Sequence, residues 1–312
     1  LRSTRARHLS GLHWRVRQTS STPILTPPAG TPTPQATADA PVPRQALQLL
    51  AHAQLAGLGV RLEGVAPPAL LLRRLNRFAS CSVEPTHLHI RQLEVRPAHA
   101  RALLDRSDIQ VFVLEEPALF GFLLTPRLAT DTIYFETAMD VVVRIALAHR
   151  LSTLDGLLLH ASGWRRPEGV ALFFGPSGAG KTATVSQAPA GEFLCDETMA
   201  VRFAAGRWVA YGTPFSKSER SMDPLNGALL GAYALEKDEQ GRGVRPLSKQ
   251  DGLARLMRCV MLHGAGASEL GGVLATSISL VEAGLVHLLK LRLGQDPWPP
   301  IEQARSTADG SA

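Results

Sequence analysis

The chain of 312 residues contains few cysteines. Cys81, Cys195 and Cys259 are far apart in the sequence, and no pair has the C-x-x-C spacing. This pattern supports neither a disulfide framework nor a structural zinc site, and it is typical of a protein that stays in a reducing compartment. We therefore expect a cytoplasmic protein.

Long apolar runs are also missing. No window reaches the roughly 18 uninterrupted apolar residues that a membrane span needs. Two apolar segments are broken by charges, DVVVRIALAHRL by Arg144 and SLVEAGLVHLLKL by Glu282 and Lys290. We expect no membrane partner, and the 45% apolar and 19% charged residues are typical of a globular protein.

Acidic residues are almost absent from the first 44 residues. Six arginines and the single acid Asp39 give this segment +5 of the formal net charge of +6, which leaves +1 for the rest. The basic isoelectric point therefore does not indicate a nucleic-acid partner. Residues 1–43 are rich in Ser, Thr, Pro and Arg, and we interpret them as a disordered tail. A transit peptide in the first 20 or so residues is the alternative.

The hydrophobic pattern after the tail predicts two regions. In the small α+β N-terminal region (44–134), RQALQLLAHAQLAGLG has helical spacing, and HLHIRQLEV, IQVFVLEE and FGFLLT predict strands. FETAMDVVVRIALAHRLSTL predicts a helix over 135–154, which opens an α/β nucleotide-binding domain (135–303). The domain continues with strands in GLLLHASGW, GVALFF, EFLCDE, AVRF and RWVAYG, helix near 250–263 and an edge strand in LVHLLKLRL. Residues 304–312 are expected to be a disordered tail.

GPSGAGKT, which begins at Gly175, matches the phosphate-binding pattern G-x-x-x-x-G-K-[ST]. Its glycines let the backbone bend around an anion, so that several N–H groups point inward. Lys181 would reach the outer phosphates, and the Thr182 hydroxyl would ligate Mg²⁺. A glycine-rich structural turn would leave both residues without a role. We expect the nucleotide to be bound by Gly175, Pro176, Ser177, Gly178, Ala179, Gly180, Lys181 and Thr182.

Two carboxylates, Asp196 and Glu197, follow this loop closely. A helix of about eight residues is expected before Pro189, after which the chain returns at once in EFLCDE. One carboxylate would hold Mg²⁺ and the other would accept a proton; a solvated pair at a strand end is the alternative. His160 ends the strand GLLLH, and the hairpin ASGWRRPEG brings it near the loop. There it either has a structural role, or orients a phosphate or assists proton transfer.

LLLHASG, GPSGAGKT and CDE together resemble the C-terminal kinase domain of HPr kinase/phosphorylase and its wider relatives. Those relatives include protein and peptide serine kinases, and their fold is related to phosphoenolpyruvate carboxykinase. VAYGTPFSKS and LLKLRLGQDPWPPIEQ are similar to further segments of the smaller members, so that the likeness covers roughly residues 135–303. It implies an α/β fold with a mixed sheet, ATP and Mg²⁺ as cofactors, and transfer of the γ-phosphoryl group to a serine hydroxyl.

The resemblance also implies roles for individual residues. Lys181 and Thr182 match the family's phosphate and metal residues, His160 matches its histidine, and Asp196 and Glu197 match its acidic pair. We take His160 and Lys181 as catalytic residues, Asp196 as the catalytic base and Glu197 as the metal ligand, and leave the reverse assignment of the two acids open.

Three further cations, Lys217, Arg220 and Arg245, are weaker candidates for holding phosphate, with solvated charges as the alternative. The glycine-rich signature loop of the phosphorylase reaction is not found, and residues 44–134 differ from the family's usual N-terminal domain. The resemblance therefore does not extend to dephosphorylation or to HPr as the substrate.

Two other functions stay open, an ATP-binding or ATP-hydrolysing regulatory module and a carboxykinase-type enzyme for a small molecule. The chain lacks the L-S-G-G-Q segment of transporter ATPases and the N/T-K-x-D motif that reads guanine. We expect a serine kinase that uses ATP and Mg²⁺ and whose partner is a protein or peptide. Its oligomeric state, a homo-oligomer included, is not indicated by the sequence.

Overall fold

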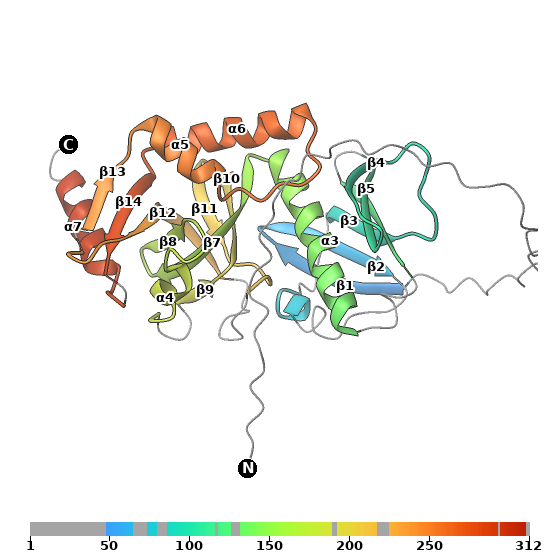
Figure 1. Ribbon diagram of the computed structural model, residues 1–312, viewed down its shortest axis with the longest axis horizontal. Coiled ribbons are helices and arrows are strands. Elements are labelled where there is room, and N and C mark those ends of the chain that lie inside the picture. The colour runs from blue at the N-terminus through green and yellow to red at the C-terminus, as the bar shows by residue number, and fades with distance from the viewer. Residues whose placement is uncertain are drawn as a thin grey trace, which may run out of the picture. The chain divides into compact units, whose positions relative to one another are not determined.

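The computed structural model contains two β-sheets with helices packed against them, a mixed α/β architecture (Figure 1). No helix in the described part of the chain is long and apolar enough to cross a membrane. The predicted tail at 1–43 lies outside the described residues. The structure describes residues 48–64, 74–79, 86–115, 118–125, 132–188, 192–216, 225–241, 243–292 and 294–309.

The first sheet lies within the predicted N-terminal region. Its six strands among the described residues follow the order β1-β2-β3-β6-β5-β4. The strands predicted from HLHIRQLEV, IQVFVLEE and FGFLLT are confirmed as β3, β5 and β6. The strands are β1 (Gln48–Leu55), β2 (Leu58–Gly64), β3 (Thr86–Gln92), β4 (Arg101–Asp105), β5 (Ile109–Glu115) and β6 (Leu119–Leu124).

The helix predicted over residues 44–59 is wrong, because its described part is a β-hairpin of β1 and β2. Every second residue, Ala51, Ala53 and Leu55, is buried in the core, which is the period of a strand. The segment has so many alanines and leucines that its apolar residues also fit helical spacing. The connecting residues Ala56 and Gly57 have φ values of 53° and 73°. A two-residue turn with positive φ matches the twist of paired strands, so that pairing and packing override helix propensity here.

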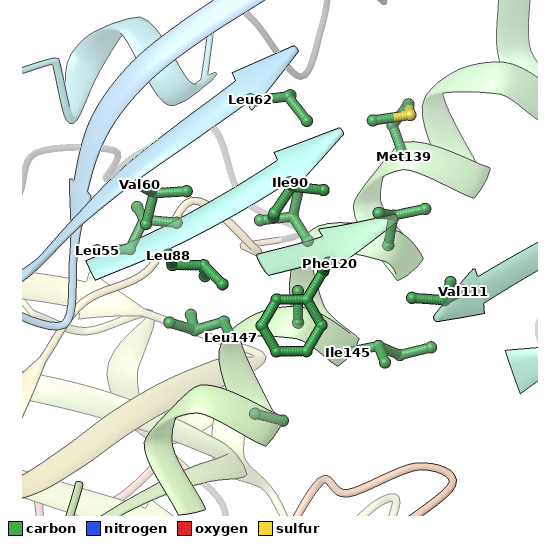
Figure 2. Close-up of a cluster of buried hydrophobic side chains, with 14 of the residues drawn as sticks. Leu55, Val60, Leu62, Leu88, Ile90, Val111, Phe120, Met139, Ile145 and Leu147 are labelled. Atoms are coloured by element: carbon green, nitrogen blue, oxygen red, sulfur yellow. The ribbon is translucent and has the colours of Figure 1, made fainter. Parts of the chain in front are cut away.

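Helix α3 (Thr132–Ser152) covers one face of this sheet. Figure 2 shows Met139, Ile145 and Leu147 of the helix beside strand residues such as Val60 and Phe120, all of them buried. The helix predicted over 135–154 is confirmed, although it begins three residues earlier.

The second sheet has eight strands among the described residues, in the order β11-β10-β7-β8-β12-β14-β13, with β9 paired to β7. β12 runs parallel to β8 and β14, and the other pairs are antiparallel. The prediction of an edge strand in LVHLLKLRL is wrong, because β13 pairs with the outer side of β14. The strands are β7 (Gly156–Arg166), β8 (Gly169–Phe174), β9 (Phe193–Cys195), β10 (Thr198–Ala204), β11 (Arg207–Tyr211), β12 (Asn226–Lys237), β13 (Gly243–Pro246) and β14 (Val286–Leu291).

Helices cover both faces of this sheet. α5 (Lys249–Met257) and α6 (Ala267–Glu282) add Leu256 and Leu280 to the apolar cluster on one face. α4 (Lys181–Val185) and α7 (Trp298–Asp309) add Val185 and Trp298 to the cluster on the other. Burial on both faces explains why β8 is apolar throughout. α7 also shows that residues 304–309 are helical and not a tail.

Candidate functional site

Strand β7 organises the candidate site. Its residue Ala161 pairs with Phe174, the last residue of β8, and its residue Gly163 pairs with Cys195, the last residue of β9. The glycine-rich loop begins directly after Phe174, and the acidic pair follows directly after Cys195. Both segments therefore leave the sheet on opposite edges of one strand, about two strand spacings or roughly 10 Å apart.

The loop has the backbone that its glycines predict. Gly178 and Gly180 have φ values of 80° and 106°, which strain any residue with a Cβ. A Cβ built at either position meets no atom within 4 Å, so that the space beside the loop is open. Helix α4 starts at Lys181 and spans five residues, shorter than the eight predicted, and Thr182 in its first turn is exposed.

Lys181 is buried at 6% exposure, and its ammonium group is satisfied by the loop itself. Nζ donates hydrogen bonds to the carbonyl oxygens of Gly175 at 2.8 Å and Pro176 at 3.1 Å. The carbonyl of Lys181 accepts a hydrogen bond from the Ser162 hydroxyl of β7 at 3.2 Å. The lysine charge is thus held at the first two residues of the loop, and the loop is tied to β7.

The two acids differ in their surroundings. Asp196 is buried at 4% exposure, and its carboxylate accepts a hydrogen bond from the Ser216 hydroxyl at 2.6 Å. Glu197 is half-buried, and its backbone carbonyl accepts hydrogen bonds from the Ala161 amide at 3.1 Å and from the His160 ring at 3.0 Å. Because a carbonyl only accepts, Nδ1 of His160 carries the hydrogen. His160 and Ser162 lie on the same face of β7, so the histidine lies on the face where the loop is tied down.

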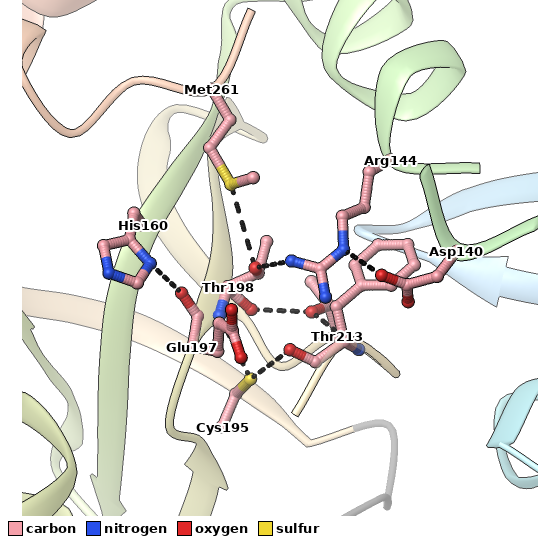
Figure 3. Close-up of polar contacts among 9 residues, drawn as sticks. Asp140, Arg144, His160, Cys195, Glu197, Thr198, Thr213 and Met261 are labelled. Carbon is pink, nitrogen blue, oxygen red and sulfur yellow. Dashed lines mark hydrogen bonds and ion pairs between the residues drawn. The ribbon is translucent and has the colours of Figure 1, made fainter. Parts of the chain in front are cut away.

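Thr198, the residue after Glu197, belongs to a polar cluster that sequence reasoning missed (Figure 3). Arg144 of α3 donates to Asp140 at 2.6 Å and to the Thr198 hydroxyl at 2.7 Å. Its guanidinium also stacks over the Phe215 ring at 4.7 Å. The four-residue spacing of Asp140 and Arg144 was the available signal.

The charge of Glu197 influences the pKa of Asp140 in this cluster. Burial raises the pKa of Asp140 above its ordinary value, Arg144 partly offsets this, and the charge of Glu197 raises the pKa further. The carboxylates of Asp140 and Glu197 therefore act on each other. Cys195 is buried, and burial raises the pKa of its thiol, so it is not a ready nucleophile.

Residues 259–261, which follow α5, pair with β7 on the side of β8, beyond the point where β8 ends and the loop begins. The Cys259 carbonyl accepts a hydrogen bond from the His160 amide at 2.7 Å, and the Met261 amide donates to Leu158 at 2.7 Å. Burial raises the pKa of the Cys259 thiol, while the Gly175 amide and the charge of Lys181 oppose this shift. Cys259 therefore lies against the start of the loop, a contact that no local sequence signal indicated.

The remaining predicted cations do not join the described site. Lys217 and Arg220 lie outside the described residues. Arg245 is exposed on β13, three strands beyond β8. Its role in holding phosphate therefore has no support from the topology.

Within the described ranges, no three His, Cys, Asp or Glu side chains are grouped to hold a metal ion. Magnesium does not require such a group, because it commonly takes one or two carboxylates together with water and substrate phosphates. The hydroxyl of Thr182 and one carboxylate of the acidic pair have the chemistry of such a site.

No protein-family model matches the chain. No curated protein matches it significantly either. The functional interpretation therefore rests on the residues around β7 and on their geometry.

Proposed function

We propose that the protein is an ATP- and Mg²⁺-dependent serine kinase that phosphorylates a protein or peptide. The observation that carries this proposal is the attachment of the glycine-rich loop and the acidic pair to opposite edges of β7. Nucleotide binding alone requires only the loop. A carboxylate pair roughly 10 Å away, two strand spacings, adds a metal ligand and a proton acceptor at the distance that a bound triphosphate spans.

The proposed reaction gives each residue of the site a separate role. Lys181 and the loop amides hold the β- and γ-phosphates. Thr182 and Glu197 hold Mg²⁺, which neutralises charge on the phosphates. Asp196 accepts the proton of the serine hydroxyl. The serine oxygen forms a bond to the γ-phosphorus while the bond from that phosphorus to the bridging oxygen breaks, which yields phosphoserine and ADP.

The proposal also includes the fold family of the nucleotide-binding domain. We infer that residues 135–303 have the fold of the HPr kinase C-terminal domain and that the protein works in the cytoplasm. Support comes from the chain order of a strand that carries His160, the loop and then the acidic pair, all assembled on β7.

The substitution Lys181→Met tests the proposal, because it keeps the apolar stem of the side chain and removes its charge. We expect ATP affinity to fall about tenfold or more, since the charge at the phosphates is lost. Lys249→Met is the matched control, because Lys249 is exposed and pairs with Glu282 on the surface. Titration with a fluorescent ATP analogue gives the affinity, and γ-labelled ATP with serine peptides gives the transfer.

Unchanged ATP affinity and turnover in Lys181→Met would contradict the proposal. Release of labelled phosphate that no serine peptide suppresses, and that never leads to labelled peptide, would instead favour the ATP-hydrolysing regulatory module.

A further inference from the structure

A cavity of about 420 Å³ opens beside the start of the glycine-rich loop. Gly175 and Pro176 line it from the loop, and Asp251, Ala254, Arg255 and Arg258 line it from α5 and the residue after that helix. Apolar residues of β8 and β12 complete its lining. This size falls within the range of pockets that bind small ligands or a few side chains.

The cavity adjoins one particular end of the loop. The ammonium group of Lys181 contacts the carbonyl oxygens of Gly175 and Pro176, the two loop residues that line the cavity. In loops of this pattern the lysine reaches the β- and γ-phosphates. A triphosphate held by the loop in this way would have its terminal phosphate next to the cavity, where an acceptor could approach it.

The charges around the cavity favour an anion. Arg258 is exposed, and the described residues form no ion pair or hydrogen bond with its side chain. Arg255 has a loose pair with Glu236 at 3.4 Å, in which both side chains are about 40% exposed. The one acid in the lining, Asp251, is engaged at the start of α5, where its carboxylate accepts a hydrogen bond from Ser248. The lining of the cavity therefore contains two arginines and one aspartate, and its net charge is positive.

We propose that this cavity is the acceptor subsite of the kinase and that it selects a serine with aspartate or glutamate one or two positions away. Arg258 directly precedes Cys259, whose thiol lies against Gly175. Since an extended peptide advances about 3.4 Å per residue, an acid adjacent to the acceptor reaches Arg258 while the serine reaches the terminal phosphate. The net positive charge of the lining attracts a carboxylate more strongly than an uncharged adenine ring. The inference rests on the proposed kinase function.

The test uses the full chain and fluorescein-labelled octapeptide libraries with one central serine. Aspartate flanks the serine in one library, and lysine flanks it in the other. Anisotropy measures peptide binding in the presence of a non-hydrolysable ATP analogue, and γ-labelled ATP measures transfer. Arg258→Glu and Ala254→Trp alter the charge and the space of the cavity. Arg207→Glu, an exposed arginine on β11, is the charge-matched control.

We expect the wild type and Arg207→Glu to bind the aspartate library about tenfold more tightly than the lysine library. Arg258→Glu should remove or reverse this preference, because it exchanges an attractive charge for a repulsive one. Ala254→Trp should weaken both libraries by filling the cavity and leave ATP affinity within about twofold.

Three outcomes would overturn the subsite. These are no preference in the wild type, an unchanged preference in Arg258→Glu, and an Ala254→Trp variant that loses ATP affinity about tenfold, which would assign the cavity to the nucleoside. Anisotropy measures peptide binding without any phosphoryl transfer, so it tests the subsite independently of the kinase activity. A preference that depends on Arg258 without transfer of label would leave the subsite standing and contradict the kinase.

Discussion

At the scale of single residues, the acidic pair presents two neighbouring carboxylates in different environments. Asp196 is buried and oriented by the Ser216 hydroxyl, whereas Glu197 is half-buried and acts electrostatically on Asp140. An oriented carboxylate suits proton transfer, and a more accessible one suits a partly hydrated Mg²⁺. This difference supports the roles proposed for the two acids.

The two roles predict different kinetics. Asp196→Asn should lower the rate of phosphoryl transfer by about 10²- to 10⁴-fold with little change in ATP affinity, because a general base is lost. Glu197→Gln should raise the Mg²⁺ concentration needed for half-maximal transfer about tenfold or more. Single-turnover transfer across a Mg²⁺ titration distinguishes them, with Glu192→Gln as a control acid outside the pair. The opposite pattern would exchange the two roles.

At the scale of elements, the β1–β2 turn is the place where local sequence preference was most misleading. Gly57 has φ of 73°, and a Cβ there would come within 3.2 Å of the Arg202 guanidinium, which donates to the Ala56 carbonyl. Gly57→Ala should therefore lower the free energy of unfolding by about 1–2 kcal/mol. Urea unfolding followed by tryptophan fluorescence measures the change.

The matched control is Gly271→Ala on α6, where the backbone is helical and an added Cβ meets no atom within 4 Å. This exchange should raise the free energy of unfolding by about 0.5–1 kcal/mol. Equal effects of the two exchanges would contradict the account of the turn.

The elements that the sequence predicted are those with strong local signals. The apolar run of β8 and the spacing of the glycine-rich loop were readable directly. Helix α6 was not, because its Gly271, Gly272 and β-branched residues have low helix propensity. It is helical because Val273 and Leu280 are buried in the core and because Gly272 allows close approach to the Ser152 carbonyl.

The same limit applies to the candidate site. The loop, His160 and the acidic pair lie close together in the sequence, so hairpin pairing was enough to predict their proximity. Arg255, Arg258 and Cys259 reach the loop only because a distant segment pairs with β7 beyond the end of β8. Pairing between distant segments is decided by the packing of the whole sheet, which one sequence does not reveal.

At the scale of the whole molecule, a buried charged cluster joins the two sheets. Glu269 of α6 contacts Arg101 of β4 and, at 2.8 Å, the ring nitrogen Nε2 of His149 on α3. His149 and Glu269 are both buried. Burial raises the pKa of Glu269, but its own backbone amide and the charges of Arg101 and His149 outweigh this, and the net pKa lies below the ordinary 4.5.

A lowered carboxyl pKa makes the contribution of Glu269 to stability dependent on pH. The contribution is present above pH 4.5, the ordinary value, and is lost as the pH falls through the lower folded-state pKa. Glu269→Gln should lower the free energy of unfolding by about 3 kcal/mol at neutral pH, since it breaks a buried ion pair. Its difference from the wild type should shrink as the pH falls below 4.5.

Urea unfolding at several pH values checks this, with Glu282→Gln on the same helix as the exposed control. A constant difference between the wild type and Glu269→Gln across that range would show that the ionised carboxylate is not the stabilising form.

The attachment of the loop and the acidic pair to one strand has a consequence for the protein without its acceptor. Their separation is set by main-chain hydrogen bonds of β7 and not by the closure of a lid. If ATP binds as proposed, the catalytic groups are assembled before any peptide arrives, and water can take the acceptor's place. Purified protein without an acceptor should then hydrolyse ATP slowly. Addition of the true acceptor should lower the rate of phosphate release, which identifies the acceptor.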